Sequence, residues 1–262
     1  MKKIVLTVLT ALAVLSPGFA QNYTIEAGGS TSVTPLMEQF AAAYARVKPG
    51  VKVNINPTGS GDGIKNAGTL YQIGMTSREL TAAEKGQGLK ETVIAIDGIA
   101  VIVHRSNPVA DLSVEQIRDI YSGAITDWSQ VSGGKKQGRI AVNSREAGSG
   151  TRGAFEELVG LKALVRGANE STSTGAIKAG VAQNPDAIGY ISLGSLDRSV
   201  RALSVGGVAA NAANVKKGSY KIARPFIVLS RDNAHAESKA FLAWMLGKEA
   251  QEIVKKSWIA VR

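Results

Sequence analysis

The sequence predicts an α/β protein, and three observations lead to this fold class. Short strand-like segments alternate with amphipathic helical segments from residue 21 onward. One long apolar run, residues 91–105, is typical of a buried strand, or of a pair of strands broken at Asp97 and Gly98. Three turns rich in glycine, serine and threonine each connect a strand to a helix. Because such turns collect at the carboxyl ends of strands in doubly wound sheets, where ligands bind, we expect them to converge.

The first twenty residues predict a secretory signal peptide. Lys2 and Lys3 form a basic start, an apolar stretch follows, and small residues lead to a cleavage site after Ala20. No later apolar run is long enough to span a bilayer. The chain contains no cysteine, so we expect neither a lipid on an N-terminal cysteine nor a disulfide. These features predict a periplasmic protein without a lipid anchor.

Composition favours a small anion as the ligand. The formal charge is +10, and loss of Lys2 and Lys3 with the signal peptide lowers it to +8. The basic residues are scattered and are not interleaved with aromatic residues, so a nucleic-acid groove is not expected. With two histidines and no cysteine, a metal site is not expected either. Cleavage leaves 242 of the 262 residues, enough for one large core or for two lobes.

The individual elements follow from periodicity and from helix start and stop signals. In the first part of the chain we predict a strand at 23–29, a helix at 34–47, a strand and glycine-rich turn at 51–61, a helix at 63–72, a short strand opening into a helix over 73–86, and the apolar strand at 91–105. In the second part we predict a helix at 113–123, a strand, turn and helix over 139–159, a helix at 174–185, strands at 187–193 and 223–230, and an amphipathic helix at 236–257.

The turn between the strand and helix of 139–159 predicts an anion site. A tetrahedral oxyanion accepts roughly a dozen hydrogen bonds, so it needs many short-range donors and no bulky walls. Ser149, Gly150 and Thr151 offer hydroxyls and glycine-exposed backbone N–H groups at a helix N-terminus, where the helix dipole also favours an anion. Arg145 can add charge-assisted hydrogen bonds in a fixed geometry. The alternative is that Ser149 and Thr151 merely cap the helix.

Four further hydroxyls are candidate ligand contacts. Thr31 and Ser32 lie in the first glycine-rich turn, Ser60 in the second, and Ser77 follows the short strand that begins at residue 73. Helix capping is again the alternative, especially in the first turn.

A dinucleotide site is a competing interpretation of the same region. Gly148, Gly150 and Gly153 have the G-x-G-x-x-G spacing after a strand, with Glu170 about twenty residues further on. The motif lies in the middle of the chain, without a clear first βαβ unit, in a protein expected to be exported. No nucleophile elbow is present, and neither histidine lies in a plausible triad context. We therefore expect a binding protein without cofactor or catalytic residues, and keep a nucleotide-dependent oxidoreductase as an alternative.

Six segments, in order, carry a family resemblance: "AGGSTSVTPLMEQF", "GSGDGIK", "IGMTSREL", "SREAGSGTRGAF", "DAIGYISLG" and "RPFIVLS". The chain resembles the phosphate-binding periplasmic component of bacterial phosphate ABC transporters, in the shorter form of that family, over nearly all of residues 23–262. Its most specific motif is Arg-x-x-Gly-Ser-Gly-Thr, residues 145–151. The resemblance implies a two-lobed type II periplasmic binding protein fold, each lobe a mixed sheet flanked by helices, with phosphate in the cleft between the lobes.

The resemblance also implies the positions of the ligand contacts. These match Thr31, Ser32, Ser60, Arg145, Ser149, Gly150 and Thr151. Better-known family members carry an aspartate in the third turn that accepts the proton of hydrogen phosphate, whereas this chain has Ser77 followed by Arg78. A carboxylate acceptor repels a fully ionised anion such as sulfate. Asp97 is our candidate substitute, with a turn residue before Gly98 as the alternative; Asp62 and Glu146 are less favoured, as helix-start residues.

The sequence as a whole predicts a monomeric binding protein that delivers phosphate to an inner-membrane ABC permease. We expect a signal peptide at 1–20, a first lobe from 21–100 and 222–262, and a second lobe from 101–221. Closure would occur about connecting segments near 98–104 and within 203–224, because an anion contacts both lobes only when they are closed. Sulfate or molybdate remain alternative ligands.

Overall fold

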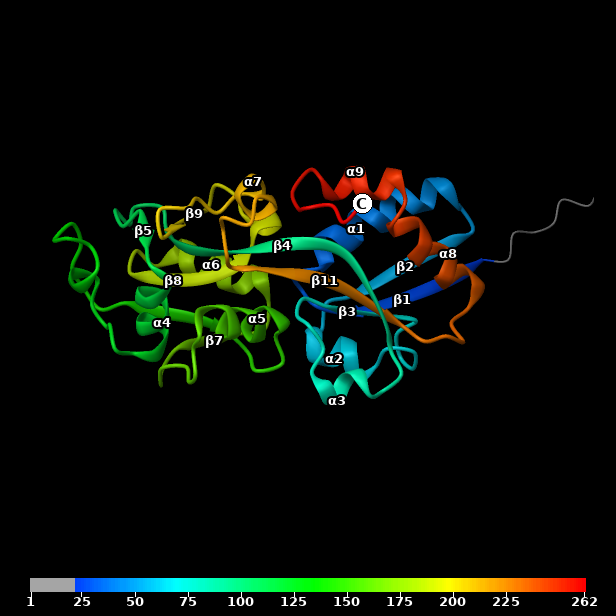
Figure 1. Cartoon of the computed structure of the whole chain (residues 1–262), viewed down its shortest axis with the longest axis horizontal. Helices are drawn as coiled ribbons and strands as arrows, with labels where there is room; N and C mark the ends of the chain where they lie inside the picture. Colours follow the sequence, from blue (N-terminus) through cyan, green and yellow to red (C-terminus); the bar gives the residue numbers. More distant parts are fainter. Residues whose placement is uncertain (1–21) are drawn as a thin grey trace, which may run out of the picture.

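Two halves lie side by side in the computed structural model, which describes residues 22–262 (Figure 1). The predicted signal peptide lies outside the described residues. Within those residues, none of the helices combines the length and apolar character needed to cross a membrane.

The elements alternate between strands and helices, as predicted. The strands are β1 (Tyr23–Gly29), β2 (Val51–Asn56), β3 (Ile73–Thr76), β4 (Lys90–His104), β5 (Asp111–Leu112), β6 (Ala141–Arg145), β7 (Asn169–Ser171), β8 (Ala187–Ser192), β9 (Val200–Ala202), β10 (Ser204–Val205) and β11 (Ala223–Ser230). The α-helices are α1 (Thr34–Val47), α2 (Ser60–Lys65), α3 (Ala82–Lys85), α4 (Val114–Ser122), α5 (Gly150–Val159), α6 (Thr174–Gln183), α7 (Ala212–Lys216), α8 (Ala236–Met245) and α9 (Lys248–Val254). Two 3₁₀ turns are η1 (Trp128–Gln130) and η2 (Leu193–Ser195).

The main sheet is mixed, which confirms the predicted fold class. Its strand order is β2-β1-β3-β11-β4-β8-β6-β7, with β9 also pairing with β4, while β5 and β10 form a separate pair. Strand β1 is parallel to β2 and β3, and β6 is parallel to β7 and β8. Strand β11 is antiparallel to β3 and β4, and β4 is antiparallel to β8.

Strand β4 runs from one half of the molecule into the other, with β11 beside it (Figure 1). The strand is continuous, so of the two alternatives for residues 91–105 a single strand is correct, and Asp97 is not a turn residue. What changes near Gly98 is the pairing partner. Residues up to Gly98 pair with β11, whereas Ile99 to Val103 pair with β8.

Two main clusters of buried side chains define the two lobes. The first packs α1, α8 and α9 against β1 and β3, and includes Phe40 and Phe241. The second packs α4 and α5 against β6 and β8, with the Phe155 and Tyr190 rings stacked at 4.0 Å between centroids. We call these parts the first and second lobe. The core changes between Ala95 and Ile99 on β4, and between Ile222, just before β11, and Phe226 on β11.

Two predicted helices have different boundaries. The helix expected at 63–72 begins at Ser60 and ends at Lys65, because Gly68 adopts a left-handed φ of 76° and Ala67 bridges to Tyr71. The helix expected at 236–257 is two helices, α8 and α9, since extended Gly247 is the N-cap of α9. The first difference places the candidate Ser60 at the start of α2 and not in the turn before it, whereas the second lies away from the turns predicted to bind the ligand.

Candidate functional site

In the first turn, the hydroxyls of Thr31 and Ser32 do not cap helix α1. Helix α1 has Val33 as its N-cap and no side-chain capping bond, so the capping alternative is wrong for Thr31 and Ser32. The backbone carbonyl of Ser30 instead accepts the N–H groups of Val33 and Thr34. Ser32 is fully buried. The turn at the end of β1 therefore presents two hydroxyls for other contacts.

Within the first lobe, the turns that follow β1 and β2 meet the turn that follows β3 at Ser77. Ser30 Oγ donates to Ser77 Oγ at 2.8 Å, and Ser60 Oγ lies 3.4 Å from Ser77 Oγ. The backbone N–H of Ser77 donates to Ser60 Oγ at 3.2 Å. All three serines are buried. Ser60 is the first residue of α2, after Gly59 at a positive φ of 99°.

The second lobe contributes the turn between β6 and α5. Ser149 is the N-cap of α5 and accepts the N–H of Arg152 at 3.3 Å, so the capping interpretation is confirmed for Ser149. Thr151 has a different partner, because its Oγ1 lies 2.7 Å from Ser32 Oγ of the first lobe. The two hydroxyls of this turn therefore have separate structural roles.

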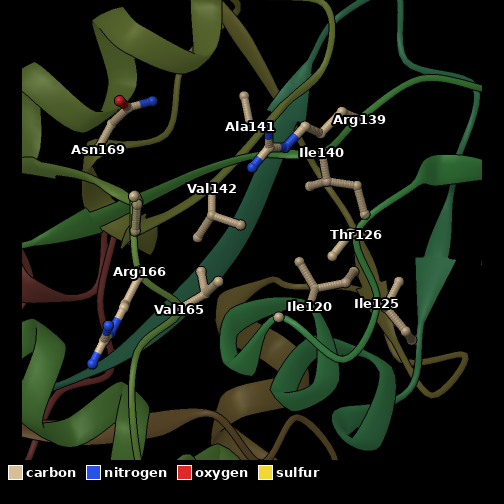
Figure 2. A pocket seen from close by; sticks show the side chains of 13 residues that line it. Ile120, Ile125, Thr126, Arg139, Ile140, Ala141, Val142, Val165, Arg166 and Asn169 are labelled. Atoms are coloured by element: carbon tan, nitrogen blue, oxygen red, sulfur yellow. The ribbon is translucent and has the colours of Figure 1, made fainter.

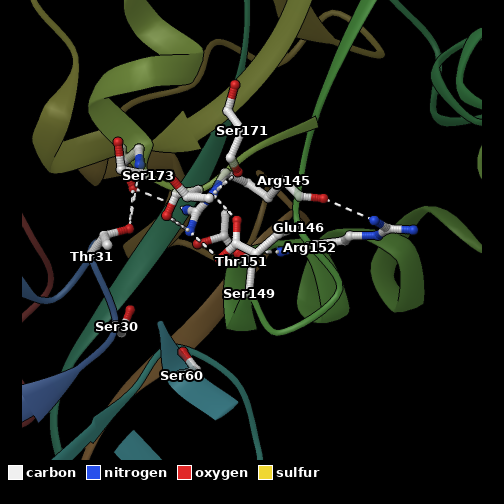
Figure 3. Close-up of polar contacts among 12 residues, drawn as sticks. Ser30, Thr31, Ser60, Arg145, Glu146, Ser149, Thr151, Arg152, Ser171 and Ser173 are labelled. Atoms are coloured by element: carbon white, nitrogen blue, oxygen red, sulfur yellow. Dashed lines mark hydrogen bonds and ion pairs between the residues drawn. The ribbon is translucent and has the colours of Figure 1, made fainter. Parts of the chain in front are cut away.

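The predicted convergence of the three turns is confirmed. Figure 3 shows Ser30 and Thr31, Ser60, and the Ser149–Thr151 turn approaching from three different segments. The N–H of Gly61 donates to the carbonyl of Gly148 at 3.0 Å across the lobes. A Cβ at Gly150 would lie 2.3 Å from Ser60 Oγ and 3.0 Å from Ser77 Oγ. This close approach requires glycine.

Arg145, next to these converging turns, is almost fully buried, at 2% side-chain exposure. Glu146 accepts from its Nε at 3.0 Å and from its Nη2 at 2.9 Å, and backbone carbonyls of Ser171 and Thr172 accept from the same two nitrogens at 3.2 Å. Its Nη1 donates to Thr174 Oγ1 at 3.4 Å. One arm of the guanidinium thus faces the hydroxyls, while Glu146 fixes the other two nitrogens.

Thr174 was missed in the sequence. This first residue of α6 has its Oγ1 2.9 Å from Ser32 Oγ and 3.2 Å from Thr31 Oγ1, and its backbone N–H donates to Thr31 Oγ1 at 3.3 Å. The signal was available, because "STSTG" at 171–175 has the same hydroxyl-and-glycine pattern before a helix. We call the following seven side chains the hydroxyl cluster: Ser30, Thr31, Ser32, Ser60, Ser77, Thr151 and Thr174.

Asp97 pairs with groups outside the hydroxyl cluster. Its Oδ1 accepts from Ser192 Oγ at 2.8 Å and its Oδ2 accepts from Arg224 Nη2 at 3.0 Å. Burial raises the pKa of Asp97 to about 6, although the charge of Arg224 and these hydrogen bonds act in the opposite direction. Direct contact between Asp97 and an anion stays a prediction, and the pairing favours an indirect role.

The chemistry of the cluster suits a tetrahedral oxyanion. Hydroxyls can turn their hydrogens toward a ligand, and Arg145 supplies positive charge inside a site with little water. The donors come from both lobes, so a bound anion would hold the lobes together. Such a donor set can bind an anion.

A separate cavity of about 310 Å³ lies in the second lobe. Figure 2 shows its apolar floor of Ile120, Val142 and Val165, with Arg139 and Arg166 on opposite sides. No member of the hydroxyl cluster lines this cavity.

Two lobes joined by crossing strands, with a donor-rich site between them, define a class of ligand-binding proteins. The chain belongs to the PBP superfamily, since residues 16–249 match the model of the PBP superfamily domain.

Curated relatives are phosphate-binding proteins by name. The chain is 30% identical over 234 residues to phosphate-binding protein PstS of Bacillus subtilis, covering 86% of this chain and 76% of that protein. It is 49% identical over 105 residues to phosphate-binding protein PstS 2 of Streptococcus agalactiae, a match that covers 40% of this chain and only 36% of the relative's length.

Solved structures share the fold. A Clostridium perfringens protein, assigned as a phosphate ABC transporter substrate-binding protein and solved with bound phosphate, has a TM-score of 0.88 and 48% identity, covering 91% of this chain and 100% of that one. An ABC-type phosphate transport receptor from Vibrio cholerae has a TM-score of 0.73 and 36% identity, covering 90% and 99%. The two-lobed fold implied by the motifs is confirmed.

Proposed function

We propose that this protein binds inorganic phosphate and delivers it to the permease of an ABC transporter. The observation that carries the proposal is the contact of the Arg145–Thr151 turn with hydroxyls of the opposite lobe, Ser32 Oγ lying 2.7 Å from Thr151 Oγ1. A phosphate held there contacts both lobes, so its binding favours the closed arrangement. The phosphate-binding relatives and the phosphate-bound C. perfringens structure support this ligand.

The proposed ligand contacts are those predicted from the sequence, apart from Asp97, together with Thr174. They are Thr31, Ser32, Ser60, Ser77, Arg145, Ser149, Gly150, Thr151 and Thr174. Most of these side chains are buried, and a hydrogen bond from a buried donor to an anion is strong because little water competes for either partner. Arg145 supplies the fixed positive charge.

Three wider features belong to the same proposal. We propose lobes of 21–100 with 222–262, and of 101–221; the change of core cluster between Ala95 and Ile99 on β4, and near residue 222, supports a division close to these bounds. The protein acts in the periplasm as a monomer, without a lipid anchor. Its role is binding and release, not catalysis.

The competing oxidoreductase is disfavoured by what surrounds its glycine motif. Gly150 lies against Ser60 and Ser77, where an added Cβ would already collide, so a pyrophosphate with its two nucleosides has little space. Glu170, the residue expected to bind a ribose, pairs instead with Arg152 at 2.7 Å. Sulfate and molybdate remain alternative ligands, because their shape and charge resemble those of phosphate.

Thermal unfolding with different additives tests this proposal. A ligand that binds only the folded protein stabilises it by about 2.7 kcal/mol at a hundred times its Kd. We expect phosphate to raise the Tm strongly, sulfate and molybdate to raise it less, and NAD to have no effect. A larger shift with sulfate or molybdate would reassign the ligand, and a shift with NAD alone would overturn the binding-protein interpretation.

A further inference from the structure

A buried ion pair lies where the two lobes join. Asp97 on β4 and Arg224 on β11 are directly opposite in the antiparallel ladder, with Asp97 Oδ2 3.0 Å from Arg224 Nη2. Their side chains are 0% and 2% exposed. Moving two charges out of water costs several kcal/mol per ion, and well-packed apolar side chains often replace such a pair without loss of stability. Stability alone therefore does not account for these two residues.

The outer hydrogen bonds of the pair lead to both lobes. On one side, Ser192 Oγ, at the end of β8, donates to Asp97 Oδ1 at 2.8 Å. On the other side, Arg224 Nη1 donates to the backbone carbonyl of Ser77 at 3.1 Å. A continuous chain of hydrogen bonds thus runs from Ser192 in the second lobe, through Asp97 and Arg224, to the turn that contains Ser77.

Arg224 holds the one group of Ser77 that would repel an anion. The carbonyl oxygen carries a partial negative charge, and Arg224 binds it. The N–H of Ser77 points to Ser60 Oγ and its hydroxyl accepts from Ser30 Oγ, so both lie with the hydroxyl cluster. If the Ser77–Arg78 peptide rotated, its carbonyl oxygen would turn toward the site, with a large electrostatic penalty for an anion in a low-dielectric environment.

Arg224 also places a second positive charge near Arg145. Burial lowers the pKa of Arg224, the charge of Asp97 raises it, and the like charge of Arg145 lowers it again. Within residues 22–262, the Nε of Arg224 is a buried donor without a hydrogen-bond partner. A dianion at the cluster relieves the repulsion between the two guanidinium groups.

We propose that Arg224, held in place by Asp97, is a positioning residue for the anion site. It holds the Ser77 carbonyl away from the ligand, while the N–H and hydroxyl of Ser77 stay with the hydroxyl cluster, and it adds a positive charge behind the turn that contains Ser77. Asp97 then acts through Arg224 and does not accept the proton of the ligand. This inference rests on the proposed function, because it concerns the same site.

Calorimetric titrations of phosphate, with sulfate measured by competition, test the role of the pair. Arg224→Gln removes the charge and the two-sided hydrogen bonding, and we expect a loss of phosphate affinity of tenfold or more. Arg224→Lys keeps the charge but lacks the planar fork, so it should recover only part of the affinity. Arg231→Gln, on the exposed segment after β11, removes the same charge far from Ser77 and should leave the affinity unchanged.

The isosteric Asp97→Asn variant separates the indirect role from direct proton acceptance. A positioning role weakens phosphate and sulfate by similar factors, because the affected group is the Ser77 turn. Direct acceptance predicts instead that discrimination against sulfate relaxes, since the repelling carboxylate is gone. A selective gain for sulfate would overturn the proposal, as would wild-type phosphate affinity in Arg224→Gln.

A measurement on the ligand-free protein keeps the inference independent of the ligand. The amide resonance of Arg78 reports the peptide whose carbonyl Arg224 binds. We expect it to shift in Arg224→Gln and Asp97→Asn and to stay unchanged in Arg231→Gln. Failure of the wild-type protein to bind phosphate would refute the proposed function, whereas an unmoved Arg78 amide in both variants would refute the positioning role.

Discussion

Ser32 Oγ of the first lobe lies 2.7 Å from Thr151 Oγ1 of the second, and Ser32 Oγ lies 2.9 Å from Thr174 Oγ1. One hydroxyl therefore contacts two helices of the opposite lobe at their first turns. Because closure brings these donors together, anything that keeps the lobes a fraction of an ångström apart should weaken anion binding.

Gly150→Ala tests this directly. The new Cβ would lie 2.3 Å from Ser60 Oγ and 2.8 Å from Ser60 Cβ, so a rotation of the serine hydroxyl cannot relieve the collision. Alanine favours the helix over glycine by up to about 1 kcal/mol, so α5 itself should not suffer. We expect phosphate affinity to fall at least tenfold while the Tm of the free protein is unchanged or higher.

Gly175→Ala is the matched control for that experiment. Gly175 follows Thr174 in α6, and a Cβ there meets only Ser173 Oγ at an ordinary 3.9 Å. This variant should bind phosphate like the wild type in calorimetry. Equal affinity of Gly150→Ala and the wild type would mean that phosphate binds without the close contact between lobes.

Arg145→Ala should cost more affinity than Ser149→Ala. Arg145 brings its own positive charge to the anion, and such a hydrogen bond contributes about 1.5–3 kcal/mol, or roughly ten- to a hundredfold in Kd, whereas Ser149 is a neutral donor whose oxygen already accepts the N–H of Arg152. Ser149→Ala also removes the N-cap of α5 and should lower the free energy of unfolding by about 1 kcal/mol. Calorimetry and urea unfolding on both variants separate the two effects; a larger loss of affinity for Ser149→Ala would mean that the charged anchor is misassigned.

The turns of this site could be predicted from the sequence because each one contains glycine and hydroxyl residues within a short segment. Glycine, serine and threonine between a strand and a helix mark Ser60 and Thr151 without knowledge of any partner. The role of Asp97 and Gly98 could not be predicted in the same way, because the strand that contains them is continuous. These two residues mark the place where the pairing partner changes from β11 to β8, which the sequence does not show.

Arg224 could not be assigned from the sequence. It lies in an apolar strand, "ARPFIVLS", whose pattern says nothing of a carboxylate 127 positions earlier. The pairing of Arg224 with Asp97 depends on the register between β11 and β4, and its contact with Ser77 depends on how β3 packs beside β11. Such long-range register is a property of the folded chain.

Thr174→Val tests the residue that the sequence did not reveal. Valine keeps the shape of threonine but removes the hydroxyl that lies near Ser32 and receives a hydrogen bond from Arg145 Nη1. We expect a three- to tenfold loss of phosphate affinity, since a neutral hydrogen bond contributes about 1 kcal/mol. The exposed Thr172→Val variant, two residues earlier, should bind phosphate normally in the same calorimetric assay. Normal binding by Thr174→Val as well would remove this threonine from the ligand contacts.

The last prediction concerns pH and Asp97. Burial raises the pKa of this carboxyl from 3.8 to about 6, so the folded protein holds a proton that the unfolded chain has lost. The contribution of Asp97 to stability is therefore full below pH 4 and falls as the pH rises through about 6. Of the groups near it, the guanidinium of Arg224 stays charged because arginine does not deprotonate in proteins, and burial raises the pKa of Tyr220, so neither titrates in this range.

Phosphate affinity should depend on the same group in the opposite direction. Ionised Asp97 holds Arg224 and, through it, the Ser77 carbonyl, whereas the neutral acid holds Arg224 weakly, as asparagine would. We expect the ratio of Kd values, Asp97→Asn over wild type, to be largest above pH 7 and to approach one below pH 5. Taking the ratio at each pH removes the titration of phosphate itself. A ratio that stays constant from pH 4.5 to 8 would show that the charge of Asp97 does not affect phosphate affinity.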